Sequence, residues 1–233
     1  MPIFYQQDID ESTKLAVWKI AEDEAFFLQH VPLQREITHP HKRLQHLAGR
    51  YLLQYLFPDF PISLIKIADT RKPYLEDEAY HFSISHCSDY AAAIVSSNKR
   101  VGVDIEVPTE KVERIMHKFL HPSEASGFKL QAASERSHEP RAVSNEQEGL
   151  SWHSNSKPQS LNSKLTLLWS SKEAVFKWWS YGQVDFSEMI RLEPFDMNEQ
   201  GLIKGRFISK EKTYGLTLHY HLFEGICLAW VAG

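Results

Sequence analysis

The stretch RVGVDIEVP, residues 100–108, alternates its side chains in the manner of a β-strand. Successive side chains of a strand point to opposite faces, so Asp104 and Glu106 share one face, while Val103 and Ile105 point to the core. Two neighbouring carboxylates repel each other, and a Mg²⁺ ion between them would relieve that repulsion. On its own, the stretch fits a solvated strand with two acids at least as well as a metal-binding strand.

Further strands are expected on both sides of this stretch. They are short and rich in β-branched or aromatic residues, and they cover residues 62–67, 80–85, 90–96, 201–209, 213–223 and 225–231. The sequence SSNK at residues 96–99 is typical of a hairpin loop. It predicts that strand 90–96 pairs with strand 100–107 in antiparallel fashion.

Helices are expected where apolar residues recur at every third or fourth position: residues 10–29, 40–57, 111–119 and 165–179. The helix 40–57 should bury its leucines and tyrosines and place Lys42, Arg43 and Arg50 on its other face. Helices and antiparallel strands thus occur twice along the chain. We therefore expect an α+β fold of two halves, residues 1–108 and 109–233, packed together.

Residues 131–163 differ in composition from the rest of the second half. They are mostly Ser, Asn, Gln, Glu, His and Pro, with few large apolar side chains. Such a segment buries too little apolar surface to offset the entropy lost on ordering it. We expect a mobile polar insertion.

The overall composition excludes several classes of protein. Lys and Arg number 26 and Asp and Glu 30, a net charge of −4, which argues against binding to nucleic acid or a membrane surface through bulk basicity. No apolar run approaches the roughly 20 residues of a membrane helix, and the acidic first residues, MPIFYQQDIDES, lack the pattern of a secretory leader. Cys87 and Cys227 are too few for a disulfide framework. These features predict a cytoplasmic protein.

Two further segments hold residue types that bind phosphate. HFSISHCSDY, residues 81–90, places Ser85 and His86 at the end of an expected strand, where both can donate hydrogen bonds to phosphate oxygens. A single histidine in such a place more often bonds a buried carbonyl. RKPYL, residues 71–75, holds two cations in a proline turn, a pattern that is also common in solvated turns.

The segment LWSSKEAVFKWW, residues 168–179, places Glu173 and Lys177 one helical turn apart on the same face. Glu173 could supply a further metal carboxylate or act as a base, and Lys177 could bind phosphate. Taken alone, the segment favours structural roles. Glu173 forms a capping-box pattern with Ser170, and with Lys177 it matches a surface ion pair that contributes about 0.5 kcal/mol or less.

In chain order, RKPYL, FSISH, VGVDIE and WSSKEAVFK resemble the motifs of the 4′-phosphopantetheinyl transferase superfamily. The resemblance covers about residues 42–179 and is closest to the longer, two-lobed members that activate carrier proteins. It implies two similar α+β halves, each a small antiparallel sheet with helices, related by a pseudo-twofold axis. It also implies a monomer that binds coenzyme A and Mg²⁺ in the cleft between the halves.

The resemblance assigns a role to each matching residue. Asp104, Glu106 and Glu173 would hold the metal. The coenzyme A ligands would be Lys177 at the pyrophosphate, Ser85 and His86 at the phosphates, Lys72 at the nucleotide end and Arg43 at the 3′-phosphate. One departure is Cys87, which stands where the family often has serine.

The implied reaction moves 4′-phosphopantetheine from coenzyme A to a serine of an acyl or peptidyl carrier protein and releases 3′,5′-ADP. Asp104, Glu173 and Lys177 would be the catalytic residues: Glu173 would take the serine proton or only bind the metal, and Lys177 would offset charge on the leaving group. Two alternatives remain. One is a metal-dependent phosphodiesterase that acts on a nucleotide-like substrate, and the other is a non-catalytic module that binds a carrier protein or coenzyme A.

Overall fold

Antiparallel pairing of short strands produces two main sheets in the part of the chain that the computed structural model describes, residues 3–128, 130 and 161–233. In spatial order, the four-stranded sheet contains β1 (Ile3–Asp10), β2 (Thr13–Lys19), β6 (Tyr90–Ser96) and β5 (His81–Cys87). The five-stranded sheet contains β7 (Val101–Glu106), β11 (Ile226–Ala232), β10 (Thr213–Phe223), β9 (Gln200–Ile208) and β8 (Ile190–Leu192). A short ribbon pairs β3 (Lys66–Ile67) with β4 (Pro73–Tyr74).

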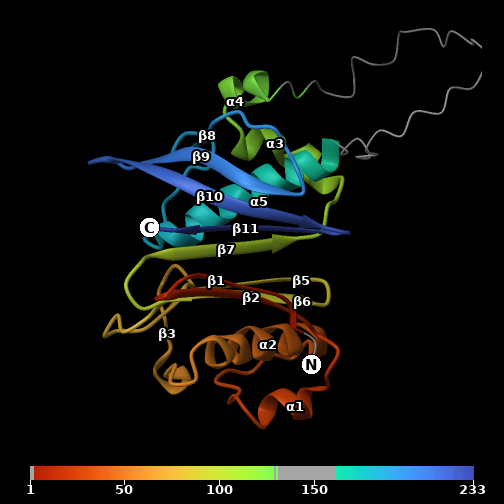
Figure 1. Ribbon diagram of the computed structural model, residues 1–233, viewed down its shortest axis with the longest axis vertical. Helices are drawn as coiled ribbons and strands as arrows, with labels where there is room; N and C mark the ends of the chain where they lie inside the picture. Colours follow the sequence, from red (N-terminus) through yellow and green to blue (C-terminus); the bar gives the residue numbers. More distant parts are fainter. Residues whose placement is uncertain (1–2, 129, 131–160) are drawn as a thin grey trace, which may run out of the picture.

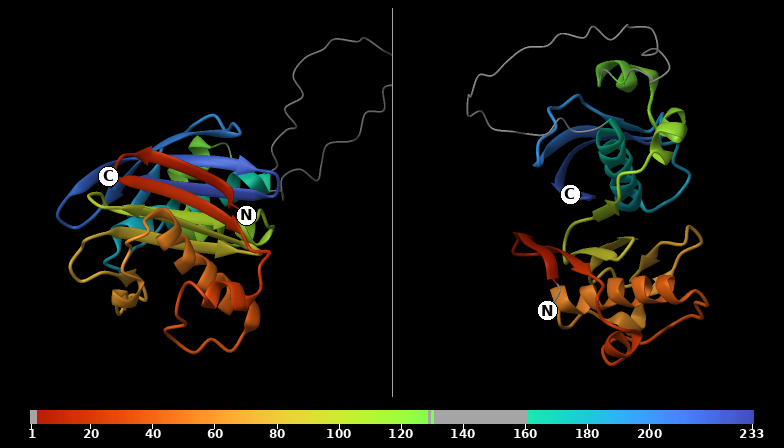
Figure 2. Two further views of the ribbon diagram at one scale, coloured as in Figure 1. Left: turned by 60° about the horizontal axis from the view of Figure 1, so that its bottom comes forward. Right: turned by 90° about the vertical axis from the view of Figure 1, so that its right-hand side faces the viewer.

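The helices are α1 (Glu24–Leu28), α2 (Pro40–Leu56), the 3₁₀ turn η1 (Ile62–Leu64), α3 (Lys111–Phe119), α4 (Pro122–Gly127) and α5 (Leu161–Trp179). Figure 1 shows α1 and α2 beneath the four-stranded sheet. The right-hand view of Figure 2 shows α5 against one face of the five-stranded sheet. None of the helices within the described ranges is long and apolar enough to cross a membrane. The prediction of an α+β fold with small antiparallel sheets is confirmed.

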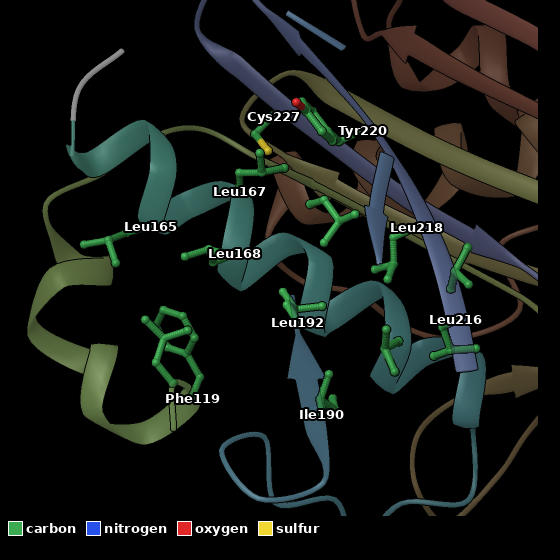
Figure 3. Close-up of a cluster of buried hydrophobic side chains, with 14 of the residues drawn as sticks. Phe119, Leu165, Leu167, Leu168, Ile190, Leu192, Leu216, Leu218, Tyr220 and Cys227 are labelled. Atoms are coloured by element: carbon green, nitrogen blue, oxygen red, sulfur yellow. The ribbon is translucent and has the colours of Figure 1, made fainter. Parts of the chain in front are cut away.

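Three hydrophobic clusters join these elements into layers. One joins α2 to the four-stranded sheet and includes Trp18 and Leu52. A second lies between the two sheets and includes Val17 and Val103. The third, shown in Figure 3, joins the five-stranded sheet to α5 through residues such as Leu168. Helix, sheet, sheet and helix therefore follow one another through the core.

The helix predicted for residues 10–29 is wrong. The segment forms the end of β1, the strand β2 and the short helix α1. In β2, Ala16 and Trp18 face α2, whereas Leu15 and Val17 face the other sheet. Because both faces of this strand are buried, its apolar residues follow one another without the alternation that marks a half-exposed strand.

The hairpin predicted across residues 96–99 is also wrong. Strand β6 pairs with β2 and β5, whereas β7 pairs with β11, so this segment connects the two sheets. It is held by the β1–β2 turn, where Ser12 Oγ donates to Asn98 Oδ1 over 2.8 Å and Lys99 Nζ bonds Asp10 Oδ2 over 2.6 Å. Turn composition indicates a change of direction, but the partner of the next strand comes from the far end of the chain.

Two other predicted segments differ from the structure. Residues 62–67 form η1 and the two-residue strand β3, because hydrogen bonds from Leu64 N to Pro61 O and from Ile65 N to Ile62 O close a turn there. The predicted mobile insertion lies outside the described residues except at its end, where residues 161–163 begin α5. Strand β7 belongs to the predicted first half by its position in the sequence. In space, however, it pairs with β11 in the five-stranded sheet.

Candidate functional site

Helix α5 lies directly on β7 because Gly102 has no side chain. A Cβ atom at Gly102 would lie 2.0 Å from the Ala174 carbonyl oxygen and 2.7 Å from the Trp178 amide nitrogen, which is closer than a side chain allows. Gly102 shares its face of β7 with Asp104 and Glu106. The two acids therefore point toward the helix that carries the next motif.

Asp104, Lys177 and Ser85 form the centre of the candidate site. Lys177 Nζ donates to Asp104 Oδ1 over 2.7 Å and to Ser85 Oγ over 2.9 Å, and Ser85 Oγ donates to Asp104 Oδ1 over 2.8 Å. Beside them, Val103 N donates to Ser83 Oγ over 3.2 Å, so the edge strands β5 and β7 of the two sheets lie side by side. Asp104 is only 3% exposed, and its Oδ2 has no hydrogen-bond partner among the described residues. The buried carboxylate thus keeps one oxygen for a further ligand.

Glu106 and Glu173 complete an acidic cluster around Asp104. Burial raises the pKa of Glu106 to about 7, and the charges of Asp104 and Glu173 add to the rise. Burial also raises the pKa of Glu173 to about 7, with a further contribution from Asp104 and an opposing one from Lys177. Ionisation of both carboxyl groups is therefore opposed by their surroundings, which a nearby cation would reverse.

The donor set of this cluster suits Mg²⁺. It consists of carboxylate oxygens, the ligand type that Mg²⁺ prefers, and it includes the unpartnered Oδ2 of Asp104. Within the described ranges, no three His, Cys, Asp or Glu side chains already converge closely enough to hold an ion. Lys177 supplies positive charge to Asp104 in this arrangement. Asp104, Glu106 and Glu173 thus fit the ion in donor type and charge.

Lys72 lies at the C-terminal end of α5. Its Nζ donates to the carbonyl oxygen of Lys177 over 2.5 Å and to Ser180 Oγ. Burial lowers the pKa of Lys72 to about 8, with smaller contributions from neighbouring cations. A hollow of about 200 Å³ opens here, and its lining includes Phe82 and Phe176 as well as the two lysines. Its lining therefore combines apolar side chains with cations.

His86 and Arg43 lie in different surroundings. His86 follows Ser85 on β5, and solvent reaches its ring, but partial burial and the Lys177 ammonium lower its pKa. Arg43 points to another group: its Nε and Nη2 lie 2.8 and 2.7 Å from Glu24 Oε2. The structure brings His86 near the centre of the site, whereas Arg43 is held by an acid of α1.

A buried basic pair on α2 adds to the residues predicted from the sequence. His46 is 8% exposed and Arg50 6% exposed, and Arg50 Nη1 lies 3.1 Å from His46 Nδ1. The sequence places Arg50 on the exposed face of its helix, and that prediction is wrong. At the preceding residue, Gly49, the helix lies close to β5: a Cβ atom there would lie 2.6 Å from Ile84 Cγ2.

The ionisable groups that act on this pair are basic side chains. Burial lowers the pKa of His46 to about 3, and Arg50, Arg35 and His86 lower it further. Burial also lowers the pKa of Arg50 to about 10, again with a contribution from Arg35. The sequence contains one signal for this pair. His46 and Arg50 are one helical turn apart on the same helix face, and the leucines beside them are buried.

Comparison with known proteins identifies one family. A family model described as the 4′-phosphopantetheinyl transferase superfamily matches residues 100–231, more than half of the chain. The matched range contains Asp104, Glu106, Glu173 and Lys177. No curated protein matches the chain.

Proposed function

The chain belongs to the 4′-phosphopantetheinyl transferase superfamily, and we propose that it transfers 4′-phosphopantetheine from coenzyme A to a serine of an acyl or peptidyl carrier protein. Coenzyme A is the co-substrate, Mg²⁺ the metal cofactor and 3′,5′-ADP the second product. Membership of the superfamily supports the transfer of phosphopantetheine in general. We further propose coenzyme A as the donor, a carrier-protein serine as the acceptor and Mg²⁺ as the metal.

The observation that carries the proposal is the convergence of β5, β7 and α5 at Asp104. One ammonium, one hydroxyl and a buried carboxylate lie within 2.9 Å of one another there. Two more carboxyl groups, Glu106 and Glu173, are close enough for the charge of Asp104 to raise their pKa values. Such a site can hold a diphosphate through its cations and accept a proton through its carboxylates.

Glu173 is the residue that we propose takes the proton of the acceptor serine. A pKa near 7 leaves a substantial fraction of Glu173 ionised at neutral pH, while the conjugate acid is stable enough to retain the proton. The group is partly buried on α5 and therefore remains accessible to an acceptor. Glu173 thus serves as a base, a metal ligand or both.

Lys177 is the residue that we propose stabilises the leaving group. Its ammonium already bonds Asp104 and Ser85, so it is held in place before the substrate binds. Positive charge fixed beside a diphosphate offsets the charge that develops as 3′,5′-ADP departs. Mg²⁺ held by Asp104, Glu106 and Glu173 would supply further charge stabilisation.

The phosphates of coenzyme A have several candidate partners near this centre. We propose Ser85, His86 and Lys72 from the motifs, and the basic pair His46 and Arg50 from the structure. The buried guanidinium of Arg50, with Arg35 close enough to act on it and on His46, provides positive charge for an anion beside His46. Arg43, which bonds Glu24, stays a prediction for the 3′-phosphate.

The proposal extends to the arrangement of the two halves of the chain. We propose that residues 1–108 and 109–233 are two similar halves related by a pseudo-twofold axis. The protein would act as a cytoplasmic monomer, with coenzyme A between the halves. No role in binding nucleic acid or membranes is proposed.

The experiment measures release of 3′,5′-ADP with Mg²⁺ and coenzyme A, with and without an apo carrier protein, and the mass of the carrier. Transfer requires release that depends on the carrier, together with a mass increase of one phosphopantetheine group on its serine. Release without a carrier would instead identify a phosphodiesterase. Binding of coenzyme A without release in the presence of several carriers would identify a non-catalytic module.

A further inference from the structure

The contact between His46 and Arg50 determines where the imidazole proton lies. Arg50 Nη1 is 3.1 Å from His46 Nδ1. A guanidinium has five N–H donors and no acceptor, so Nδ1 must accept this hydrogen bond through its lone pair. The proton of the neutral ring is then on Nε2.

We propose that Arg50 is a positioning residue that holds His46 in the Nε2–H tautomer, so that His46 presents an N–H donor to a phosphate group of coenzyme A. The choice of ligand rests on the proposed function. The tautomer rests only on the contact within α2.

The Nε2 atom of His46 lacks the partner that a buried donor normally has. It is enclosed, and no group among the described residues bonds it. Leaving a buried donor unpaired destabilises the folded chain. An acceptor that arrives with a ligand removes this cost, whereas a purely structural histidine would have found a carbonyl.

The surroundings indicate that the missing acceptor is an anion. The groups whose charge acts on His46 are Arg50 and Arg35, which are cationic at neutral pH, and His86, which is cationic only when it is protonated. No carboxylate in the described part of the chain forms an ion pair with Arg50, although that side chain is only 6% exposed. A buried cation without a counter-charge is costly, and a phosphate beside His46 would supply that counter-charge.

Packing between α2 and β5 connects this donor to the candidate site. Gly49 lies against Ile84 of β5, and Ile84 shares its strand face with His86. His46 is therefore held on the side of α2 that leads to His86, and from there to Ser85 and Lys177. Arg50 contacts His46 from the next turn of α2.

The test combines ¹⁵N NMR of the full chain, labelled on histidine, with coenzyme A binding by calorimetry. The signals of His46 are identified by their loss in His46→Ala. At pH 7 we expect a protonated Nε2 and an unprotonated, hydrogen-bonded Nδ1 in the wild type. In Arg50→Met, the Nδ1 resonance should move and coenzyme A binding should weaken about tenfold. Arg50→Lys, which keeps a donor, should recover part of both, and Arg191→Met, a matched arginine paired with Glu188, should change neither.

A double-mutant cycle separates positioning from a direct effect of charge. If Arg50 acts mainly by positioning His46, Arg50→Met should cause a much smaller loss of affinity in the His46→Ala background than in the wild type, because only the direct effect of its charge remains. A proton on Nδ1 in the wild type, or an equal loss in both backgrounds, would overturn the positioning role. Failure of the wild type to bind coenzyme A would overturn the ligand and the proposed function, while the spectra would still report the tautomer.

Discussion

Two lysine–carboxylate pairs on helix α5 have the same length and opposite surroundings. Lys172 Nζ lies 2.7 Å from Glu124 Oε2, and Lys177 Nζ lies 2.7 Å from Asp104 Oδ1. Both lysines belong to the segment SSKEAVFK. The ion pair alone therefore does not distinguish a structural contact from a functional one.

The Lys172–Glu124 pair is satisfied at every atom. Lys172 is fully buried and also donates to the carbonyl oxygens of Phe119, Phe186 and Ile190, at 2.7, 3.0 and 2.7 Å. Burial lowers the pKa of Lys172 to about 8, so the ammonium persists at neutral pH. The pair ties α5 to α3, α4, Phe186 and β8, and has no capacity for a ligand.

The Lys177–Asp104 pair is unsatisfied. Asp104 Oδ2 has no partner among the described residues, and the raised pKa values of Glu106 and Glu173 indicate uncompensated repulsion. Lys177 is partly exposed, in contrast to Lys172. The difference teaches that unpaired polar atoms, rather than the ion pair, mark the position where a ligand belongs.

The largest effect is expected from Glu173→Gln, which removes a charge at the unsatisfied pair. Loss of a base typically slows a reaction about 10²–10⁴-fold, roughly 3–5.5 kcal/mol in the barrier. Stability should not fall, because the change removes a buried carboxyl whose ionisation is opposed. Carrier-dependent release of 3′,5′-ADP measures the effect, with Glu211→Gln, an exposed turn residue, as control. Full activity in Glu173→Gln would exclude Glu173 as base and essential ligand.

Lys172→Met should have the next largest effect, which is a loss of stability. Removal of one partner leaves Glu124 buried and uncompensated, which costs about 3–5 kcal/mol. Urea unfolding measures the loss. Lys164→Met, on the same helix with one bond of 3.1 Å to the Phe128 carbonyl, should cost about 1 kcal/mol or less.

Adding Glu124→Gln to Lys172→Met should recover part of the stability, because the remaining buried charge is neutralised. If the single variant unfolds like the wild type, the contrast between the two pairs fails.

Sequence patterns predict an element correctly where a single hydrophobic repeat runs through the segment. The alternation in residues 213–223 and the helical repeat in residues 165–179 match β10 and the greater part of α5. The opposite directions of Asp104 and Val103 follow from strand geometry and are also present. The motif residues Ser85, Asp104 and Lys177 meet in space.

The rest depends on contacts that no local pattern records. Strand β2 is buried on both faces, so its residues lack alternation, and the partner of β7 is β11 from the end of the chain. Arg50 is buried on the same helix on which Gly49 lies against Ile84 of β5, a long-range contact that the helical repeat does not record. Lys172 stands in the same motif as Lys177, and only its four acceptors reveal that it is structural.

A smaller effect is expected from His86→Ala. His86 lies next to Ser85 at the end of β5 and would contribute one hydrogen bond to a charged phosphate. Its loss should weaken coenzyme A binding by about 1.5–3 kcal/mol, roughly 10–150-fold. Calorimetry measures the affinity, and His117→Ala on the exposed face of α3 is the control. An unchanged affinity would mean that the site ends at Ser85.

The smallest effect is a dependence of stability on pH that only the unsatisfied pair should produce. Glu106 and Glu173 have pKa values of about 7 in the folded chain and about 4.5 when unfolded. Between these values the folded state binds more protons than the unfolded state, so stability falls as pH rises from about 4.5 to 7. The window lies below the pKa of Lys172, which is about 8. With a chelator present, Tm of the wild type should therefore fall more than Tm of Glu106→Gln/Glu173→Gln between pH 5 and 7.5, by about 2–4 °C for each kcal/mol of pH-dependent stability. Addition of Mg²⁺ should remove the difference, because the ion stabilises the ionised carboxylates and binds more tightly as they lose protons. Parallel curves for the two proteins would show that the carboxyl groups are not coupled to folding, and the contrast with the Lys172–Glu124 pair would then rest on hydrogen bonding alone.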